Sequence, residues 1–434
     1  MAASWLLMAV ELPALSVVVA RLPNPEANLA AYGGVIWPLA MIIEAPIVML
    51  LSASTALSRN WATYRKIYRF MMVSGACLTL LHLVVAFTPL YYWVAESLLG
   101  VPPEVVEPGR LGLRIMTPWA WAIGYRRFQQ GVLIRFGHSR AVGVGTAVRL
   151  VTDCLVLALG YSIGSLPGAM VGSGAVALGV VAEAAYAGWR VQPVLRSQVR
   201  PAPAGQPLTW RAFADFYVPL MLTSMMTLAL QPIGSAALSR MPHALDSLAT
   251  WPVLTGLVFM LRSAGMAYNE VVVALLDEPG SSGTLRRFTT VLGAAVTALM
   301  LVLAATPLAR LWFSDVSALP PRLAEMARVG LWLALPLPLL NVLQSWYQGA
   351  ILHGRRTRGI PEAVVLATGI MIAVLVAGIV WGRAVGLYVG VVGLTAASAS
   401  QTLWLWVRSR PVMAVVRRRD EAASAACPGG APTP

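Results

Sequence analysis

The segment Tyr125–Arg140, YRRFQQGVLIRFGHSR, places two adjacent arginines, Arg126 and Arg127, inside a stretch that is otherwise typical of a membrane-spanning helix. About 218 residues later, Ser345–Gly359, SWYQGAILHGRRTRG, repeats its Gln-Gly pair and its basic end. The repetition bears on the architecture of the chain. The two arginines have no counterpart in the second copy, and they bear on its function.

The composition is that of a membrane protein. Of the 434 residues, 58% are hydrophobic and 12% are charged, which is about half the charged share of a soluble protein. The apolar runs Val35–Leu57, Phe288–Leu308 and Ala363–Val380 are long enough to cross a hydrocarbon core of roughly 30 Å as helices. The sequence therefore predicts a polytopic helical membrane protein.

The cationic residues give a formal net charge of +14, but they lie in short segments between the hydrophobic runs. The positive-inside rule expects this of cytoplasmic loops, so we expect no nucleic-acid partner. The three cysteines, Cys77, Cys154 and Cys427, and the four histidines form no metal-binding, disulfide or catalytic pattern. We therefore expect neither an enzyme nor a cofactor.

Twelve spans fit the hydrophobic pattern best and predict an all-α membrane protein built of two halves. Residues 1–190 form an N-terminal six-helix half, 191–211 a Pro- and Arg-rich cytoplasmic linker, and 212–407 a C-terminal six-helix half. Residues 408–434 form a basic cytoplasmic tail that we expect to be disordered. Most arginines lie in loops after even-numbered spans, which predicts a multi-pass inner-membrane protein with both termini cytoplasmic.

The two halves carry an internal repeat. Near their starts, the L-A-x-Y of Leu29–Tyr32 falls near the L-A-x-W of Leu248–Trp251, one residue out of the 218-residue offset. Six helices per half return the chain to the same side of the membrane, which predicts parallel repeats around a central cavity. The prolines of the repeat should bend spans four and ten. The matched positions are Pro118 with Pro336, Gln130 with Gln348, Gly131 with Gly349 and Arg140 with Arg358.

This pattern of six plus six helices, with a Gln-Gly pair and a basic loop after spans four and ten, resembles the MATE-like superfamily of multidrug, oligosaccharidyl-lipid and polysaccharide exporters. Within it, the progressive ankylosis transport proteins are the most similar branch, on the segments Leu29–Gly33, Gly131–Arg140 and Asn269–Leu276. The resemblance implies an exporter, with citrate, nucleotides or pyrophosphate as substrates. It also implies an acidic functional residue near Asp153.

Four polar residues are candidates for substrate binding: Arg126, Arg127, Gln130 and Arg262. Arg126 lies nine residues before Arg135, about 13 Å along a helix, which is too far for its side chain to reach the interface. Guanidinium groups that line a cavity match carboxylate and phosphate groups. The alternative is that the arginines pair with acidic residues and only hold helices together.

Three buried acidic residues, Glu44, Glu270 and Asp153, are candidates for coupling to an ion, either a proton or sodium. A buried carboxylate whose cationic partner moves away during transport is suited to take up a proton. Glu44 and Glu270 are also the expected partners of the arginines in the structural alternative. Arg149 and Asp153 are four residues apart, which favours an internal ion pair.

These observations predict a secondary transporter that exports a small organic or phosphorylated anion by alternating access. Its expected partners are the anionic substrate, membrane lipids and a coupling ion. The alternatives are a flippase for a lipid-linked saccharide and proton- or sodium-coupled multidrug efflux. A membrane scaffold without transport activity fits worst, because it gives the buried charges no role.

Overall fold

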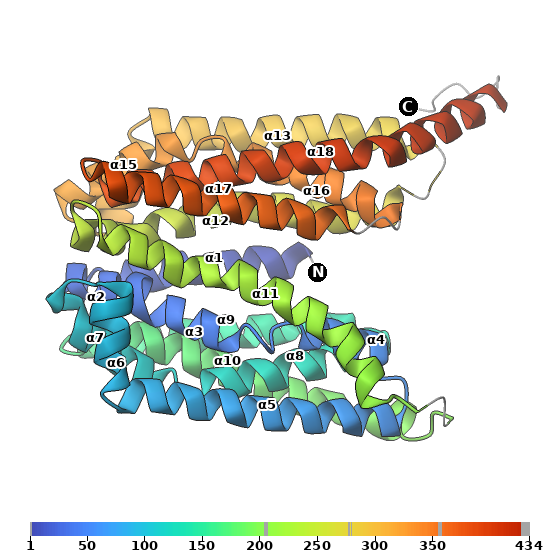
Figure 1. Ribbon diagram of the computed structural model, residues 1–434, viewed down its shortest axis with the longest axis horizontal. Helices are drawn as coiled ribbons and strands as arrows, with labels where there is room; N and C mark the ends of the chain where they lie inside the picture. Colours follow the sequence, from blue (N-terminus) through green and yellow to red (C-terminus); the bar gives the residue numbers. More distant parts are fainter. Residues whose placement is uncertain (1, 204–206, 277, 279, 355–357, 427–434) are drawn as a thin grey trace.

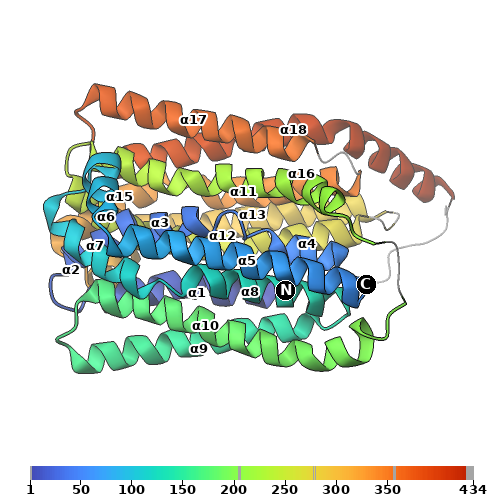
Figure 2. The same ribbon diagram turned by 60° about the horizontal axis from the view of Figure 1, so that its bottom comes forward.

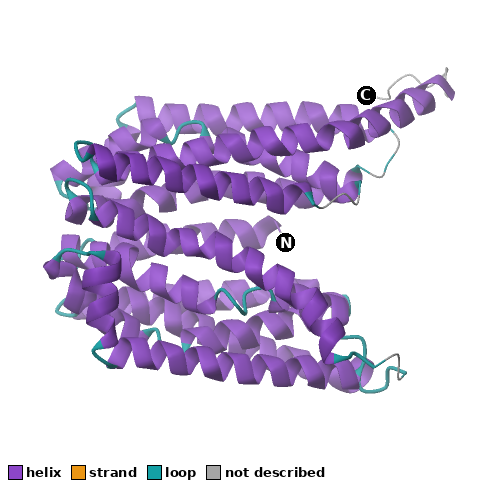
Figure 3. Cartoon of the chain, in the orientation of Figure 1, coloured by secondary structure: helices purple, strands orange, loops and turns teal. Residues whose placement is uncertain are grey.

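The computed structural model describes residues 2–203, 207–276, 278, 280–354 and 358–426. Helices joined by turns and short loops make up this part of the chain, and it contains no strand (Figure 3). The N-terminal half begins with α1 (Ala2–Val19), α2 (Pro25–Ala31), the π-helical turn η1 (Tyr32–Ile36), α3 (Trp37–Glu44), α4 (Leu50–Leu57) and α5 (Trp61–Phe87). It continues with α6 (Leu90–Tyr92), η2 (Trp93–Leu99), α7 (Pro103–Ile115), α8 (Trp119–Arg135), α9 (Ser139–Ile163), α10 (Gly168–Val194) and η3 (Leu195–Val199).

The C-terminal half repeats this order with fewer interruptions. It comprises α11 (Trp210–Ser239), α12 (Ala244–Leu275), α13 (Ser281–Ala305), α14 (Leu308–Arg310), η4 (Leu311–Val316), α15 (Pro321–Leu333), α16 (Leu337–His353), α17 (Gly359–Trp381) and α18 (Gly386–Ala426).

The spans predicted from the sequence are present as helices. Eight helices of the described chain are long and apolar enough to cross a membrane, and the bent pair α15–α16 makes a ninth. The other three predicted spans correspond to α1, whose apolar part Met8–Val19 is short, to the broken pair α7–α8, and to α18. The predicted fold class, an all-α polytopic membrane protein with twelve spans in two halves, is therefore confirmed.

The internal repeat is also present in three dimensions. The bounds of α15 and α16 are those of α7 and α8 shifted by 218 residues. Pro118 and Pro336 stand immediately before α8 and α16 with φ of −73° and −71°, and α15 meets α16 at an angle of 41°. Both prolines thus lie at a break in their span, as predicted, because proline cannot continue the hydrogen-bond ladder of the preceding helix.

The two halves lie side by side, one below the other in Figure 1, and the first helix of each half contacts the other half. The helix α1 lies between the halves and packs on α12, whereas α11 runs diagonally and packs on α3. The turned view in Figure 2 shows the same bundle of roughly parallel spans. We call the end that holds α4 and the C-terminal end of α18 the linker end, and the end that holds α2, α7 and α15 the opposite end (Figure 1).

Four helices, α5, α9, α13 and α17, turn large apolar side chains outward. Leu80 on α5 is 62% exposed, Leu159 on α9 is 64% exposed and Val380 on α17 is 81% exposed. In a soluble protein such surfaces would be unusual, whereas hydrocarbon tails cover them in a bilayer. The exposed apolar faces therefore mark the surface that lipid contacts.

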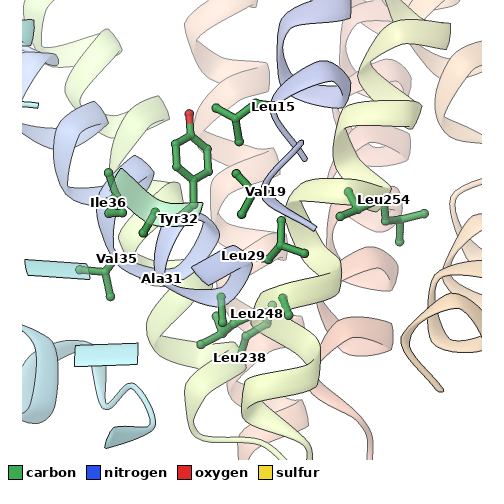
Figure 4. Close-up of a cluster of buried hydrophobic side chains, with 14 of the residues drawn as sticks. Leu15, Val19, Leu29, Ala31, Tyr32, Val35, Ile36, Leu238, Leu248 and Leu254 are labelled. Carbon is green, nitrogen blue, oxygen red and sulfur yellow. The ribbon is translucent and has the colours of Figure 1, made fainter. Parts of the chain in front are cut away.

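A continuous hydrophobic cluster joins the two halves (Figure 4). Leu15, Val19 and Tyr32 enter it from the N-terminal half, and Leu238 and Leu248 enter it from the C-terminal half. The halves approach each other so closely here that glycine is required on η1. A Cβ atom at Gly33 would lie 2.8 Å from Cδ of Pro252 and 3.1 Å from the carbonyl oxygen of Leu248.

The tail and the linker differ from the sequence predictions. The sequence predicts disorder from residue 408, but α18 continues as a helix to Ala426. Arg419 donates hydrogen bonds to the carbonyl oxygens of Leu276 and Glu278, which stabilises the extended helix. The predicted linker starts at residue 191, yet α10 and η3 remain helical to Val199. Residues 204–206 and 427–434 lie outside the described residues.

Candidate functional site

The first part of the site is a buried ion pair between α8 and α10. Arg126 on α8 contacts the carboxylate of Glu183 on α10, and the two residues are 5% and 0% exposed. Gln130, one turn along α8, donates a hydrogen bond of 2.9 Å from Nε2 to Oε1 of Glu183. Both oxygens of the carboxylate therefore have a partner, which is the condition for a buried charge to be tolerated.

The second part of the site joins α1 to α9. Arg149 on α9 contacts the carboxylate of Glu11 on α1, and its Nε lies 3.8 Å from Oδ2 of Asp153 one turn away. Neither carboxylate oxygen of Asp153 accepts a hydrogen bond from a described residue. The predicted pairing of Arg149 with Asp153 is therefore confirmed, but Glu11 is the closer partner. Asp153 keeps free lone pairs in a buried position.

The backbone of α10 is shaped to receive Asp153. A Cβ atom at Gly179 would lie 1.8 Å from Oδ1 of Asp153 and 2.8 Å from its Cγ. Any larger residue at this position would displace the carboxylate from the face of α10. Gly179 therefore lets Asp153 of α9 pack closely against α10, the helix that carries Glu183. One electrostatic network links Asp153, Glu183 and Arg149.

The third part of the site is formed by Glu44 and Arg127. Glu44 ends α3 and is 4% exposed, and its Oε2 has no hydrogen-bond partner in the described chain. Among the cations, Arg127 acts on it most strongly and Arg126 next. Arg127 itself makes no hydrogen bond and no ion pair within 4.0 Å with a described residue. The two side chains therefore attract each other through space without a direct contact.

The C-terminal half lacks this cluster at the equivalent positions. With the 218-residue offset, Arg126 corresponds to Gln344 and Arg127 to Ser345, while Glu44 corresponds to Arg262. The charged trio of α9 and α10 is replaced by uncharged side chains. The replacements are Ala367 for Arg149, Met371 for Asp153 and Gln401 for Glu183.

A pocket of ≈ 260 Å³ takes the place of the charged cluster in the C-terminal half. It lies among α11, α12, α17 and α18, and Gly33 of the N-terminal half also lines it. Arg262 is the charged residue of the lining, and within the described residues it forms no ion pair or hydrogen bond. The amides of Gln231 and Gln401 face the same pocket, and no described residue bonds to them either.

The structure thus separates the predicted site residues into three places. Arg126, Arg127, Gln130, Glu44 and Asp153 gather in the N-terminal half. Arg262 lies in the pocket of the other half, where no other charged side chain of the described chain lines the wall. Glu270 lies on α12, and it forms no ion pair with an arginine among the described residues. The structural alternative drawn from the sequence pairs the arginines with Glu44 and Glu270, whereas among the described residues Arg126 contacts Glu183.

Sequence reasoning missed two acidic residues, Glu11 and Glu183. A span that ended near Trp189 would place Glu183 close to the membrane interface, where a charge needs no explanation. The helix instead continues through Val199, so Glu183 lies near its middle. Glu183 could have been recognised as deeply buried if the end of this span had been placed at the last amphipathic turn of the helix. Glu11 gives no such signal, because its partner Arg149 is distant in the sequence.

No group of three His, Cys, Asp or Glu side chains in the described part of the chain is arranged to hold a metal ion. The side chains that the site presents carry guanidinium, carboxylate and amide groups, which interact through charge pairing and hydrogen bonds.

Two pseudo-symmetric six-helix halves, with buried charge in one and a cationic pocket in the other, make up this polytopic membrane protein. The fold is that of the MATE transporters of the MOP superfamily. The chain is similar to an inward-facing multidrug resistance MATE family transporter, with a TM-score of 0.73 and 12% identity, covering 94% of this chain and 96% of that one.

Two further solved structures share the fold. One is a MOP superfamily transporter from Pyrococcus furiosus, described as having a binding pocket of reverse polarity that suggests a different function. It has a TM-score of 0.60 and 15% identity, covering 95% of this chain and 96% of that one. The other is the lipid II flippase MurJ, inward closed, with a TM-score of 0.60 and 12% identity over 93% of this chain and 89% of that one.

No protein-family model matches the chain, and no curated protein matches it in sequence.

Proposed function

We propose that the protein is a secondary transporter that moves a small organic anion across the membrane by alternating access. The two-half fold supports this proposal, because transporters with parallel repeats bind substrate between halves that rock against each other. The pocket around Arg262 lies at this boundary, with Gly33 of the N-terminal half in its lining. A solute bound there would contact both halves.

The proposal that the substrate is an anion rests on Arg262, because this buried guanidinium has no ionic partner among the described residues. In the N-terminal half, Arg126 and Arg149 contact acidic side chains. Arg262 has no such partner in the described chain, and burial of an unpaired guanidinium costs free energy. A bound carboxylate or phosphate would supply the missing charge. A cationic drug would be repelled by it, which disfavours conventional multidrug efflux.

The charged cluster of the N-terminal half is suited to ion coupling. Asp153 and Glu44 are buried carboxylates with oxygens that lack hydrogen-bond partners in the described chain. A movement of Arg149 or Arg127 away from them would leave a buried negative charge, which favours uptake of a proton. We assign coupling to these two acids and not to Glu270, because Glu270 lies outside the cluster.

A lipid-linked saccharide, the cargo class named for MurJ, fits this pocket less well. A volume of ≈ 260 Å³ lies just below the range of pockets that enclose small molecules, roughly 300–1,000 Å³. The proposal therefore commits to a small solute and leaves the flippase as the alternative.

Exchange of labelled solutes by proteoliposomes tests the proposal. We expect saturable uptake of a small organic anion that Arg262→Gln reduces at least tenfold, because the variant removes the one cation that lines the pocket among the described residues. Arg286→Gln, at an exposed position near the start of α13, is the matched control and should transport normally. Uptake by Arg262→Gln equal to that of the control would contradict the anion site.

A further inference from the structure

The pocket around Arg262 offers one positive charge and no more. Within the described residues its lining contains a single cationic side chain, whereas the equivalent positions of the N-terminal half hold Arg149, Asp153 and Glu183 in addition to Glu44. Arg262 can hold one carboxylate through two parallel hydrogen bonds. A second negative charge on the same ligand would have no cation to meet it, and its desolvation would be uncompensated.

The neutral polar groups of the pocket add to this selectivity. Gln231 and Gln401 carry amide groups that no described residue bonds, so each can donate a hydrogen bond to a ligand. Ser398 also lines the pocket, but its carbonyl oxygen already accepts a hydrogen bond of 2.9 Å from Gln344. Two amides and one guanidinium are enough for a single carboxylate and its neighbouring polar atoms.

Most of the remaining lining is apolar and includes the indole ring of Trp251, while Thr227 and Ser235 add hydroxyl groups. Trp251 projects from α12 toward α18, where a Cβ atom at Gly390 would lie 2.9 Å from the edge of its ring. The remaining apolar contacts come from aliphatic side chains and one methionine of the C-terminal half. They are contributed by Leu230, Leu238, Leu248, Ala367, Met371, Leu394 and Ala397. Such walls favour a ligand with an apolar body.

We propose that the pocket binds organic anions that carry one negative charge on a small apolar or aromatic body, and that it rejects di- and trianions of similar size. This inference rests on the proposed function only in using the same pocket, and it narrows the substrate class. The class differs from the citrate, nucleotides and pyrophosphate that the resemblance to ankylosis proteins implies, because those ligands bring several charges.

Three matched probes separate charge from shape: benzoate, its neutral isostere benzamide, and phthalate, which adds a second carboxylate to the same ring. Binding to the full-length protein in nanodiscs at pH 7 is measured by titration calorimetry. We expect benzoate to bind at least tenfold more tightly than either benzamide or phthalate. In Arg262→Gln the preference for benzoate over benzamide should disappear, whereas Arg262→Lys should retain part of it.

A second variant guards against misfolding of Arg262→Gln. Gln401→Glu places an acid where the N-terminal half carries Glu183, so the equivalent helix already tolerates it. The new carboxylate should compete for Arg262 and weaken benzoate binding at least tenfold, while Arg286→Gln should bind benzoate normally. The thermal unfolding midpoint of each variant confirms that it is folded.

The outcomes distinguish this inference from the proposed function. Phthalate or citrate binding as tightly as benzoate, and dependent on Arg262, would overturn the restriction to single charges while leaving anion transport intact. Absence of binding by all three probes would also overturn it. Benzoate that binds with the expected preference but does not exchange across proteoliposomes would support the inference and contradict the proposed transport.

Discussion

Arg21 and Arg240 end the first helices of the two halves at equivalent positions, and each reaches across to the other half. Nη2 of Arg21 donates a hydrogen bond of 2.8 Å to the carbonyl oxygen of Asp315 in η4. Nη2 of Arg240 donates one of 2.9 Å to the carbonyl oxygen of Leu98 in η2, and its Nη1 donates one of 3.0 Å to that of Leu99. Each guanidinium thus caps the negative end of a helical turn in the other half.

These two contacts should hold the opposite end of the protein closed. In the double variant Arg21→Gln and Arg240→Gln, each half loses charged hydrogen bonds worth about 1 kcal/mol. The two losses sum to about 2 kcal/mol, so we expect the population with an open opposite end to rise by roughly thirtyfold, since about 1.4 kcal/mol corresponds to a factor of ten. Spin labels at Glu104 on α7 and Glu325 on α15, in a cysteine-free background, would report a longer distance.

The control for this measurement is Arg383→Gln. Arg383 is exposed in the turn between α17 and α18, at the same end of the bundle. The substitution removes a positive charge there and leaves the contacts between the halves in place. An unchanged distance distribution in the double variant, equal to that of Arg383→Gln, would show that the arginines do not hold this end.

Removal of only one partner of the ion pair between Arg126 and Glu183 should lower the stability of the protein. Glu183→Gln leaves the Arg126 guanidinium buried without an opposite charge, and such changes destabilise proteins by about 3–5 kcal/mol. The double variant Arg126→Gln and Glu183→Gln places glutamine at both positions, as in the C-terminal half, where Gln344 and Gln401 stand. It should recover most of the lost stability.

The thermal unfolding midpoint in detergent measures this recovery. A double variant that is as unstable as the single variant would indicate that the pair is retained for packing and not for charge balance. Transport should still be impaired in the double variant, because Glu183 belongs to the network around Asp153.

Replacement of Gly179 should destabilise the protein, because this residue packs directly against Asp153. In Gly179→Ala the new Cβ would collide with the Asp153 carboxylate, and overpacking of this kind costs about 1–3 kcal/mol. Gly174→Ala in the same helix is the matched control, because its nearest neighbours would be 4.0 Å away. There, alanine should be neutral or slightly stabilising, by up to about 1 kcal/mol. Comparison of the two unfolding midpoints checks the prediction.

Asp420 should anchor the helical tail to the start of α13. Burial opposes ionisation, but hydrogen bonds from Ser282, Gly280 and Arg419 hold the pKa of Asp420 below its usual range. A carboxylate with a depressed pKa stabilises the contact above its unfolded pKa, and this stabilisation is lost as the pH falls through the lower, folded value. The tail contact should therefore persist at neutral and mildly acidic pH.

Hydrogen exchange tests the tail contact. Asp420→Asn removes the charge and should raise exchange over residues 408–426 at pH 7, since loss of a helix-capping carboxylate costs about 1 kcal/mol. Glu421→Gln, which changes an exposed neighbour, is the control. Equal exchange in the two variants would indicate that contacts other than that of Asp420 hold the tail.

Local features of the sequence are sufficient to predict the architecture of this protein. Hydropathy set the spans, and polar residues such as Gln130 with Gln348, together with the prolines before α8 and α16, established the repeat. These features are local, because a run of apolar residues long enough to cross a bilayer has to form a helix to satisfy its backbone. The tail of α18 was the local exception, since contacts with Gly280 and Ser282 stabilise a helix that its composition alone does not require.

Which buried charges face each other depends on tertiary packing and does not follow from the sequence pattern. Arg126 has acidic residues at many distances along the chain, and nothing in their spacing selects Glu183 over Glu44. The selection depends on how α8 and α10 rotate and on the close approach that Gly179 permits. The isolation of Arg262 is likewise a property of the packed molecule, because a guanidinium is unpaired only when the side chains that surround it supply no acid.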